Sequence, residues 1–325
     1  MHKNKLAMAV AFACATLSSL PAFAQDNTGN NDQKHPSTLQ TIVVTGTRAF
    51  DRTAADSLAP IDVLTPKELM STGAPDLTTA LRTLLPSFNF PQPSLTDATD
   101  ASMPAQLRGL APDETLVLID GKRQHTTAIV NVNGSIGRGS SPVDLSAIPM
   151  NAIARVEVLR DGAAAQYGSD AIAGVINIIL KGGADHGGAY VSYGQHDGGQ
   201  GDTWRGGADG GFALGNNGWV HLSANYLNQD PTNHAGPDIR YPGDPTYGTV
   251  TFHYGLPKEI AKQAAVNAQY NLGENATLYA FSVFNKRNVE AGGFFRSLSQ
   301  YDTSTPAAAA VYPDGYLPIE NSAIR

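Results

Sequence analysis

Residues 154–181 read ARVEVLRDGAAAQYGSDAIAGVINIILK, and the rest of the chain is organised around this stretch. In its first part, Val156 and Val158 fall on one face of an extended backbone and Glu157 falls on the other. Side chains of a strand point alternately to its two faces, so this alternation predicts a strand over residues 155–160.

The second part of the stretch predicts a turn and another strand. Asp-Gly at residues 161–162 breaks the first strand, and residues 163–167 are long enough for one tight helical turn. Residues 175–180 are an apolar, β-branched run, which is typical of a buried strand. Periodicity alone also fits an ordinary βαβ corner at this place.

The residues before this stretch predict a strand and two helices. Residues 61–64 are a short β-prone run. The sequence TPKE at residues 65–68 then offers a capping threonine, a proline at the first helical position and a glutamate three residues after the cap. Asp76 begins a second helix with a leucine stripe along one side, and Pro86 ends it.

Between the second helix and the central stretch, the sequence predicts further strands. They fall at residues 107–109 and 115–119, and Asp-Gly at residues 120–121 is a hairpin signal that leads into residues 122–125. Residues 87–103 contain prolines and turn residues without a clear period, which indicates a loop. Together these elements predict an α+β domain, a mixed sheet with short helices.

Several ordered blocks of this region resemble the plug domain of the TonB-dependent outer-membrane receptors. The blocks are QLRG at residues 106–109, LIDG at 118–121, PVDL at 142–145, VEVLR at 156–160, YGS at 167–169 and AGVIN at 173–177. The family often has Gly-Pro after the arginine of the fourth block, where this chain has Asp-Gly, and the departure suggests a subfamily. The resemblance implies a plug domain over residues 54–181.

From residue 182 onward the hydrophobic period becomes two. Apolar and polar residues alternate over residues 189–194, 220–226 and 264–272, and weaker strands are predicted over 204–214 and 277–284. A transmembrane β-barrel needs apolar side chains outside and polar ones inside, because lipid offers backbone groups no hydrogen-bond partner. Alternation alone also fits a soluble antiparallel sheet with one wet face.

The connections between these strands favour the barrel. The predicted links over residues 195–202 and 228–257 are longer than those over 215–218 and 273–275, as expected when long external loops alternate with short periplasmic turns. The longest link is rich in proline and is a candidate external contact for a ligand. The resemblance implies a plugged barrel of about 22 strands, so residues 182–325 are expected to be the N-terminal part of a barrel that is incomplete in this chain.

The N-terminus predicts export. Two lysines precede an apolar run over residues 6–20, and AFA at residues 22–24 is a small-x-small cleavage site, so residues 1–24 are predicted to be a signal peptide. The single cysteine, Cys14, lies inside the apolar run, so the processed chain is expected to have no disulfide and no thiol chemistry. Residues 25–53 are largely polar and are predicted to be a flexible tether.

The tether contains one β-prone island, LQTIVVTGTR at residues 39–48. The island fits the first strand of the following domain, or a strand offered to the sheet edge of a partner, where main-chain hydrogen bonds give affinity. Residues 40–46 resemble the TonB box, which implies pairing with the inner-membrane-anchored TonB protein through Thr41, Ile42, Val43, Val44 and Thr45. The short tether leaves no room for a periplasmic signalling domain.

The resemblance also implies contacts inside the receptor. Plug arginines of this family pair with acidic residues of the barrel wall, which implies that role for Arg108 and Arg160, although charged strand residues usually face solvent. Residues 89–104 and 126–141 are expected to be apical loops that face the outside. The second loop lacks a phosphate-loop motif and is expected to face the ligand with Asn131, Asn133, Ser135 and Arg138.

Composition and motifs argue against several other classes. A net charge of −7 with 16% charged residues argues against a nucleic-acid surface, which needs clustered lysine and arginine. The sequence has no G-x-S-x-G motif, no H-E-x-x-H motif and no zinc-like His/Cys spacing. We therefore expect no catalytic residues, no metal site and no cofactor.

The main interpretation is a TonB-dependent receptor in the outer membrane. It is expected to take up a large external ligand, a ferric siderophore or else a carbohydrate or cobalamin, with energy transmitted by TonB and its inner-membrane complex. Outer-membrane lipid is the expected surrounding. The alternative is a truncated, soluble periplasmic binding module that uses the plug without a closed barrel. A secreted hydrolase has no nucleophile–base motif to support it.

Overall fold

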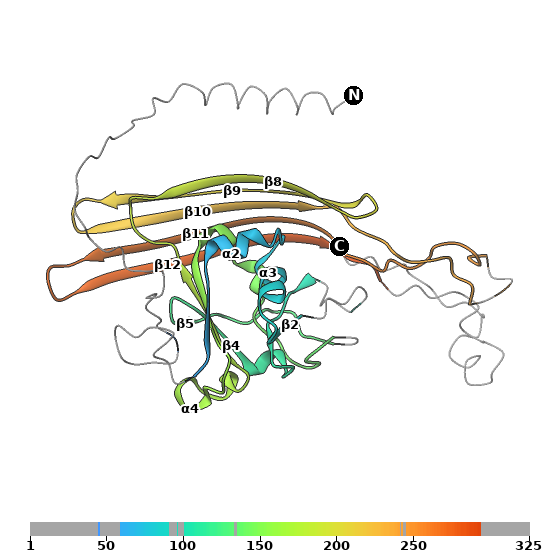
Figure 1. The fold of residues 1–325 in the computed structure, drawn as a ribbon, viewed down its shortest axis with the longest axis horizontal. Coiled ribbons are helices and arrows are strands. Elements are labelled where there is room, and N and C mark those ends of the chain that lie inside the picture. Colours follow the sequence, from blue (N-terminus) through green and yellow to red (C-terminus); the bar gives the residue numbers. More distant parts are fainter. Residues whose placement is uncertain are drawn as a thin grey trace, which may run out of the picture. The chain divides into compact units, whose positions relative to one another are not determined.

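The computed structural model describes residues 45, 59–90, 96, 101–132, 135–240, 242 and 245–293. All of them belong to one compact unit, which begins at Thr41. The predicted signal peptide, most of the predicted tether and residues 294–325 lie outside the described residues, as does part of the predicted loop 89–104. Figure 1 shows the elements discussed below.

The first part of the described chain, residues 59–181, is built on a five-stranded sheet and is called the mixed-sheet domain here. Its strands lie in the order β1 (Ile61–Leu64), β6 (Ile153–Leu159), β7 (Gly174–Leu180), β4 (Thr115–Ile119) and β5 (Lys122–Arg123). Only the β4–β7 pair is parallel, and the other pairs of this sheet are antiparallel. The predicted mixed sheet is therefore confirmed.

The central stretch forms β6, the short helix α4 (Ala164–Tyr167) and β7. Because β6 and β7 run antiparallel, the stretch is a strand, turn and strand and not a βαβ corner. Gly174 begins β7 with φ of +144°, and a Cβ atom there would lie 2.4 Å from the main-chain oxygen of Leu159. The close approach of the two strands therefore requires glycine at this position.

The two predicted helices are α2 (Pro66–Ser71) and α3 (Leu77–Leu84). Thr65 caps α2 by the predicted capping box: its hydroxyl accepts from the Glu68 N–H at 3.3 Å, and the Glu68 carboxylate accepts from the Thr65 N–H at 2.7 Å. Shorter elements complete the domain: β2 (Phe88–Asn89), η3 (Pro112–Glu114), β3 (Gln106–Leu107), η4 (Leu145–Ala147), η5 (Met150–Ala152) and η6 (Ser169–Ala171).

Both faces of the mixed sheet are covered. Val156 and Val158 of β6 pack in the main core with the leucines of α2 and α3, whereas Leu159 packs in a second cluster with residues next to α4. Glu157 also has no exposed surface. Charged strand residues usually face solvent, but Glu157 does not, and its carboxylate accepts hydrogen bonds from Thr45 and from Arg155.

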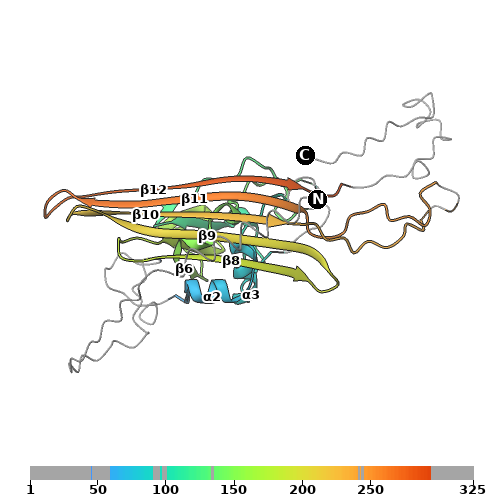
Figure 2. The ribbon, with the colours of Figure 1, turned by 90° about the horizontal axis from the view of Figure 1, so that it is seen from above.

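The second part of the described chain, residues 187–290, is an antiparallel sheet of five strands, the long-strand sheet. The strands are β8 (Gly187–His196), β9 (Gln200–Leu214), β10 (Gly218–Gln229), β11 (Lys258–Asn271) and β12 (Thr277–Glu290). Each pairs with the next strand of the chain, as Figure 2 shows from above. The predicted run of antiparallel strands is confirmed.

The connections between these strands correct one prediction. Residues 197–199 form only a short turn between β8 and β9, because the pairing of these strands continues to His196 and Gln200. The predicted long link over residues 195–202 is therefore wrong. Residues 230–257 do form a long connection between β10 and β11, and residues 215–217 and 272–276 form short ones.

The two faces of the long-strand sheet differ in polarity. On β10, Leu222 and Tyr226 lie on one face and are exposed. His221 and Ser223, the neighbours of Leu222 in the sequence, lie on the other face and are buried. Val191 on β8 exposes 79% of its surface. The apolar outer face and the polar inner face are the pattern that a wall in lipid requires.

Candidate functional site: contacts between the mixed-sheet domain and the long-strand sheet

Arg287 on β12 joins the long-strand sheet to the turn that begins η4. Its Nη2 lies 2.6 Å from Oδ2 of Asp144, and its guanidinium also donates to the Ser146 hydroxyl and to the main-chain oxygen of Ala101. The side chains of Arg287 and Asp144 are 8% and 15% exposed. The ion pair is therefore largely shielded from water.

Two residues of β11 complete this group of contacts. Glu259 Oε1 lies 3.8 Å from Arg287 Nη1, and the Glu259 side chain is 5% exposed. Gln263 Nε2 donates to the main-chain oxygen of Ser146 at 2.6 Å. Arg287 is thus the cation between the largely shielded carboxylate of Asp144 and the buried carboxylate of Glu259. Removing it would leave both carboxylates without a counter-ion, which is costly where water has little access.

Asp76, the residue that caps α3, is also buried. Its carboxylate accepts from the main-chain N–H and the hydroxyl of Thr79 at 2.9 and 2.8 Å. Burial nevertheless raises the pKa of Asp76 above its ordinary value, although the bonds from Thr79 and the charge of Arg287 lower it. A raised folded-state pKa gives stability that is fully present below the unfolded-state pKa and is lost as pH rises through the folded-state value.

We therefore expect Asp76→Asn to make the protein less sensitive to rising pH. Asparagine keeps the cap, because its side-chain oxygen accepts from the N–H of Thr79, but it has no carboxyl to ionise. The measurement is the thermal unfolding midpoint of the purified protein across a pH series that starts at about pH 4. Asp76→Ala should show the same flatter profile with a further loss of about 1 kcal/mol from the missing cap. A profile of Asp76→Asn that follows the wild type would contradict this account.

A second group of contacts lies at the end of α2 and at η5. Arg205 on β9 donates to the main-chain oxygen of Ala74 and, at 3.1 Å, to that of Gly73. Asn151 reaches in the opposite direction, since its Nδ2 donates to main-chain oxygens of β9 and β10 at 3.0 and 2.9 Å. Each half of the molecule thus supplies a side chain that binds the backbone of the other.

A third group lies where the chain passes from the mixed-sheet domain to β8. Lys181 Nζ is 2.9 Å from Asp209 Oδ1, and the other oxygen of Asp209 is 3.1 Å from His221 Nε2. His221 Nδ1 lies 3.3 Å from the main-chain oxygen of Gly183. These contacts fix the segment that follows β7 against β9 and β10.

The interface between the two parts is therefore largely polar. The apolar core of the mixed-sheet domain reaches the sheet at Ala265, Phe281 and Val283, while the hydrogen bonds and ion pairs above come from β9, β10, β11 and β12. Water can replace hydrogen bonds when such an interface opens, so its net cost of separation is smaller than the gross strength of its contacts. These contacts hold the domain against the long-strand sheet.

The predicted TonB-binding residues lie mostly outside the described residues, and only Thr45 can be placed. Thr45 is 1% exposed. Its N–H and its hydroxyl both donate to Glu157 Oε2, at 3.0 and 2.6 Å, and its hydroxyl accepts from Asn177 Nδ2 at 3.1 Å. Thr45 is thus bound to the central strands of the mixed sheet, and the pairing with TonB stays a prediction.

Arg108 and Arg160 have ion-pair partners inside the mixed-sheet domain. Arg108 Nη1 lies 3.6 Å from Asp161 and donates to the main-chain oxygen of Arg160 at 3.1 Å. Arg160 Nε lies 2.7 Å from Asp62. Both arginine side chains keep about two fifths of their surface exposed, at 42% and 40%. Their expected pairing with acidic residues of a barrel wall stays a prediction.

The residues predicted to face a ligand differ in their surroundings. Asn131 is fully buried, its Nδ2 donates to the main-chain oxygen of Ile136 at 2.7 Å, and its N–H donates to that of Ser140 at 2.9 Å. Asn131 thus sets the shape of the loop. Arg138 is exposed and Ser135 is half-buried, while Asn133 lies outside the described residues. The ligand-facing role of this loop stays a prediction.

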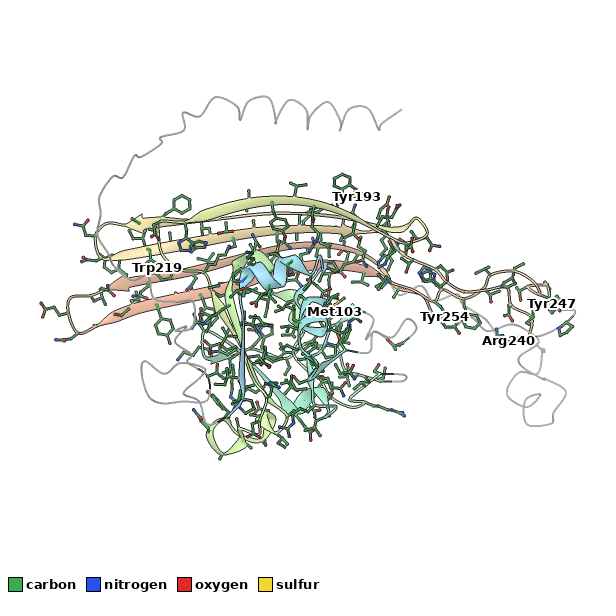
Figure 3. The ribbon with its side chains drawn as sticks, viewed as in Figure 1. Met103, Tyr193, Trp219, Arg240, Tyr247 and Tyr254 are labelled. Atoms are coloured by element: carbon green, nitrogen blue, oxygen red, sulfur yellow. The ribbon has the colours of Figure 1, made fainter. Side chains whose placement is uncertain are left out.

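The long connection over residues 230–257 carries an aromatic surface. Tyr247 and Tyr254 are 48% and 45% exposed, and Figure 3 shows them in the same connection as Arg240. Arg240 lies 4.7 Å above the ring of Phe252 and binds both oxygens of Asp238, at 2.9 and 2.6 Å. These bonds from Arg240 hold the pKa of Asp238 well below its usual range.

Sequence reasoning missed the side chains that join the two parts. Arg287 lies beyond residue 284, where the last strand was predicted to end, and Gln263 lies just before the alternation predicted from residue 264. Arg205 belongs to a strand whose weak pattern did not define its faces. One signal in the sequence could have indicated these residues: a charged or amide side chain at a position of an alternating strand that faces inward.

The described residues show neither a metal centre nor a membrane-spanning helix. Within the described ranges, no three His, Cys, Asp or Glu side chains are grouped so that they could bind a metal ion. In the same part of the chain, every helix is too short or too polar to cross a bilayer.

Comparison with known protein families gives one match. Residues 53–175 match the family described as the TonB-dependent Receptor Plug Domain. Curated relatives include the vitamin B12 transporter BtuB of Vibrio cholerae, 32% identical over 60% of this chain and 27% of its own length. The ferric enterobactin receptor PirA of Pseudomonas aeruginosa is 32% identical over 55% of this chain and 24% of its own length. The chain thus spans about a quarter of the length of these relatives.

Solved structures share the fold. One is a mutant of the ferric enterobactin receptor PfeA of Pseudomonas aeruginosa in complex with enterobactin, with a TM-score of 0.57 at 22% sequence identity. The match covers 72% of this chain and 34% of the PfeA chain. Another is the siderophore receptor PirA of Acinetobacter baumannii, with a TM-score of 0.54 at 20% sequence identity. The match covers 79% of this chain and 35% of the PirA chain. Identities this low show a common fold and nothing finer.

Proposed function

Because the chain carries the plug domain of the TonB-dependent receptors over residues 53–175, we propose that it acts in an outer-membrane receptor that imports a large external ligand. In this proposal the mixed-sheet domain is the plug and the long-strand sheet is part of the barrel wall. The observation that carries the proposal is the polar interface between them, centred on Arg287 and Asp144. A gate must be held closed and must also open, and a polar interface suits both states because water can replace its hydrogen bonds.

The proposal assigns a task to each part of the chain. Residues 1–24 are a signal peptide for export, and residues 25–53 are a tether that carries the TonB box. Residues 54–181 are the plug, and residues 182–325 are the first part of the barrel, set in outer-membrane lipid. The proposal includes no enzymatic activity, which is consistent with the curated relatives named above, a transporter and a receptor.

The mechanism follows from the contacts. The plug closes the passage while Arg205, Arg287 and Lys181 hold it on the wall. An external ligand binds to the loops of plug and barrel, and TonB then pairs with Thr41, Ile42, Val43, Val44 and Thr45. Force from the inner membrane displaces the plug, and water takes over the hydrogen bonds that are lost at the polar interface.

The ligand is best sought among ferric siderophores. The relatives and the solved structures with this fold include receptors named for ferric enterobactin and one transporter named for vitamin B12. Enterobactin and cobalamin therefore head the list of candidates, with carbohydrates as a further class. Exposed Tyr247 and Tyr254 would offer aromatic surface to an aromatic siderophore.

The test is an uptake assay with the native protein in cells that lack their own receptors for ferric enterobactin and cobalamin. We expect uptake of labelled ferric enterobactin above the background of cells without the protein, and labelled cobalamin serves as the second ligand. Recovery of the protein in the soluble periplasm without uptake of any ligand would contradict the proposal and would favour a soluble binding module.

A further inference from the structure

We propose that Lys262 and Lys286 form a binding site for a phosphate group of an outer-leaflet lipid. The inference rests on the proposed function, because it needs the long-strand sheet to be a wall in the outer membrane. Lys262 on β11 and Lys286 on β12 are directly opposite each other in the register of this antiparallel pair, and both are exposed. Figure 2 shows the two strands side by side.

Both lysines lie on the outer face of the long-strand sheet, which points away from the mixed-sheet domain. Their neighbours in the sequence, Gln263 and Arg287, bind Ser146 of that domain. Adjacent residues of a strand point to opposite faces, so Lys262 and Lys286 point outward. The outward side of a barrel wall faces lipid, and in the proposed barrel the lysines are therefore in reach of lipid headgroups.

The pair of lysines is electrostatically incomplete. Like charges directly opposite each other destabilise a sheet. Within the described residues, neither lysine forms an ion pair with a carboxylate. The outward carboxylate of β12, Glu290, is opposite a different lysine, Lys258. An anion between Lys262 and Lys286 would replace their repulsion by attraction, and phosphate oxygens can accept hydrogen bonds from both ammonium groups.

The lysine pair marks one edge of the apolar band. From the pair toward the short connections, the outward positions of β11 and β12 carry no charged side chain. These positions are Ala264, Val266, Ala268 and Tyr270 on β11 and Phe284, Ser282, Ala280 and Leu278 on β12. The lysines therefore lie where the surface changes from apolar to polar, which is the depth of the headgroups in a membrane wall.

Aromatic side chains lie at nearly the same level. Tyr193 and Trp204 are opposite each other on β8 and β9, their ring centroids are 4.8 Å apart, and each is 52% exposed. Through β10, Trp204 is in register with Ile260, which is two residues from Lys262. Tyrosine and tryptophan collect at the interface between lipid and water. This aromatic row supports the placement of the lysines at the headgroups.

The connections identify the leaflet. The long connection over residues 230–257 ends at Lys258, four residues before Lys262. Long connections of such barrels lie on the external side, so the lysine pair lies in the outer leaflet. Lipopolysaccharide is the main lipid of that leaflet, and its lipid A anchor carries phosphate groups. Lysine stems can lie along the apolar surface while the ammonium groups reach these phosphates.

Tyr226 extends the site along the same row. It lies opposite Lys262 on the side away from Lys286, and it is 42% exposed. A tyrosine ring is apolar along its body and polar at its hydroxyl, which suits the boundary between acyl chains and headgroups. The row Tyr226, Lys262, Lys286 therefore offers an apolar contact and two positive charges to one phosphorylated lipid.

The experiment measures lipid binding to the native protein in detergent by native mass spectrometry. The probes are lipid A, lipid A stripped of its phosphates, and inorganic phosphate as a competitor. The double variant Lys262→Gln/Lys286→Gln should bind lipid A about 10- to 30-fold more weakly, because each lysine near an anionic surface strengthens binding several-fold. The wild type should bind the stripped lipid as weakly as the double variant binds lipid A.

Two control variants accompany the measurement. Lys262→Arg/Lys286→Arg keeps both charges and should keep the affinity for lipid A. Lys67→Gln removes an exposed lysine of helix α2, outside the long-strand sheet, and should bind lipid A as the wild type does.

Three results would overturn the site. They are equal affinity of the wild type and the double glutamine variant for lipid A, equal affinity of the wild type for lipid A with and without phosphates, and full displacement of lipid A by millimolar inorganic phosphate. Any of these with normal ligand uptake would refute the lipid site alone. Recovery of the wild type in the soluble periplasm without uptake would refute the proposed function and the lipid site together.

Discussion

Arg287→Ala is expected to loosen the plug and to let large antibiotics through the outer membrane. The substitution removes the cation that lies between the partly shielded carboxylate of Asp144 and the buried carboxylate of Glu259. It also removes the donors to Ser146 and Ala101. Loss of one partner of a buried ion pair costs about 3–5 kcal/mol, which is far more than an exposed pair contributes. The measurement is the sensitivity to vancomycin of cells that make the variant.

Two control variants sharpen this prediction. Arg287→Lys keeps the positive charge but loses the planar fork that serves several acceptors at once, so its sensitivity should lie between wild type and Arg287→Ala. Arg123→Ala removes an arginine whose partner, Asp170, belongs to the plug itself and whose side chain is half exposed, so resistance should stay at the wild-type level. Full resistance in cells that make Arg287→Ala in the outer membrane would show that this contact does not hold the plug.

Val43→Pro is expected to abolish energy-coupled uptake while ligand binding to the cell surface persists. Proline has no N–H to donate and cannot continue a paired strand, so residues 41–45 would no longer pair with the sheet edge of TonB. The measurements are equilibrium binding and time-dependent uptake of the ligand identified in the uptake assay.

Val43→Ile is the matched control for this variant. Isoleucine keeps the N–H and the β-branched shape, so uptake should equal that of the wild type. Equal loss of binding and uptake in Val43→Pro would point to misfolding. Full uptake in Val43→Pro would remove residues 41–45 from the coupling role.

The elements that the sequence predicted well are those whose signals are local. The cap of α2 depends on Thr65 and Glu68, which are three residues apart, and the structure forms both of its hydrogen bonds. Asp76 caps α3 at the predicted position for the same reason. The alternation of β10 and β11 is also local, because neighbouring residues of one strand point to opposite faces.

The features that the sequence did not predict depend on residues far apart in the chain. The buried carboxylate of Glu157 is paired with Thr45 and Arg155, and nothing near residue 157 in the sequence indicates the first of these partners. Arg287 meets Asp144 across 143 residues, so its role follows only from the packing of β12 against η4. The short β8–β9 turn reflects pairing register, which glycine-rich and polar strand ends specify weakly.

The most direct test of the central claim is uptake of the identified ligand in cells with and without TonB. If the plug is a gate that TonB opens, cells that make the native protein should accumulate the labelled ligand only when TonB is present, while surface binding is the same in both strains. Equal accumulation in cells that lack TonB would contradict the account, because the plug would then open without the coupling segment.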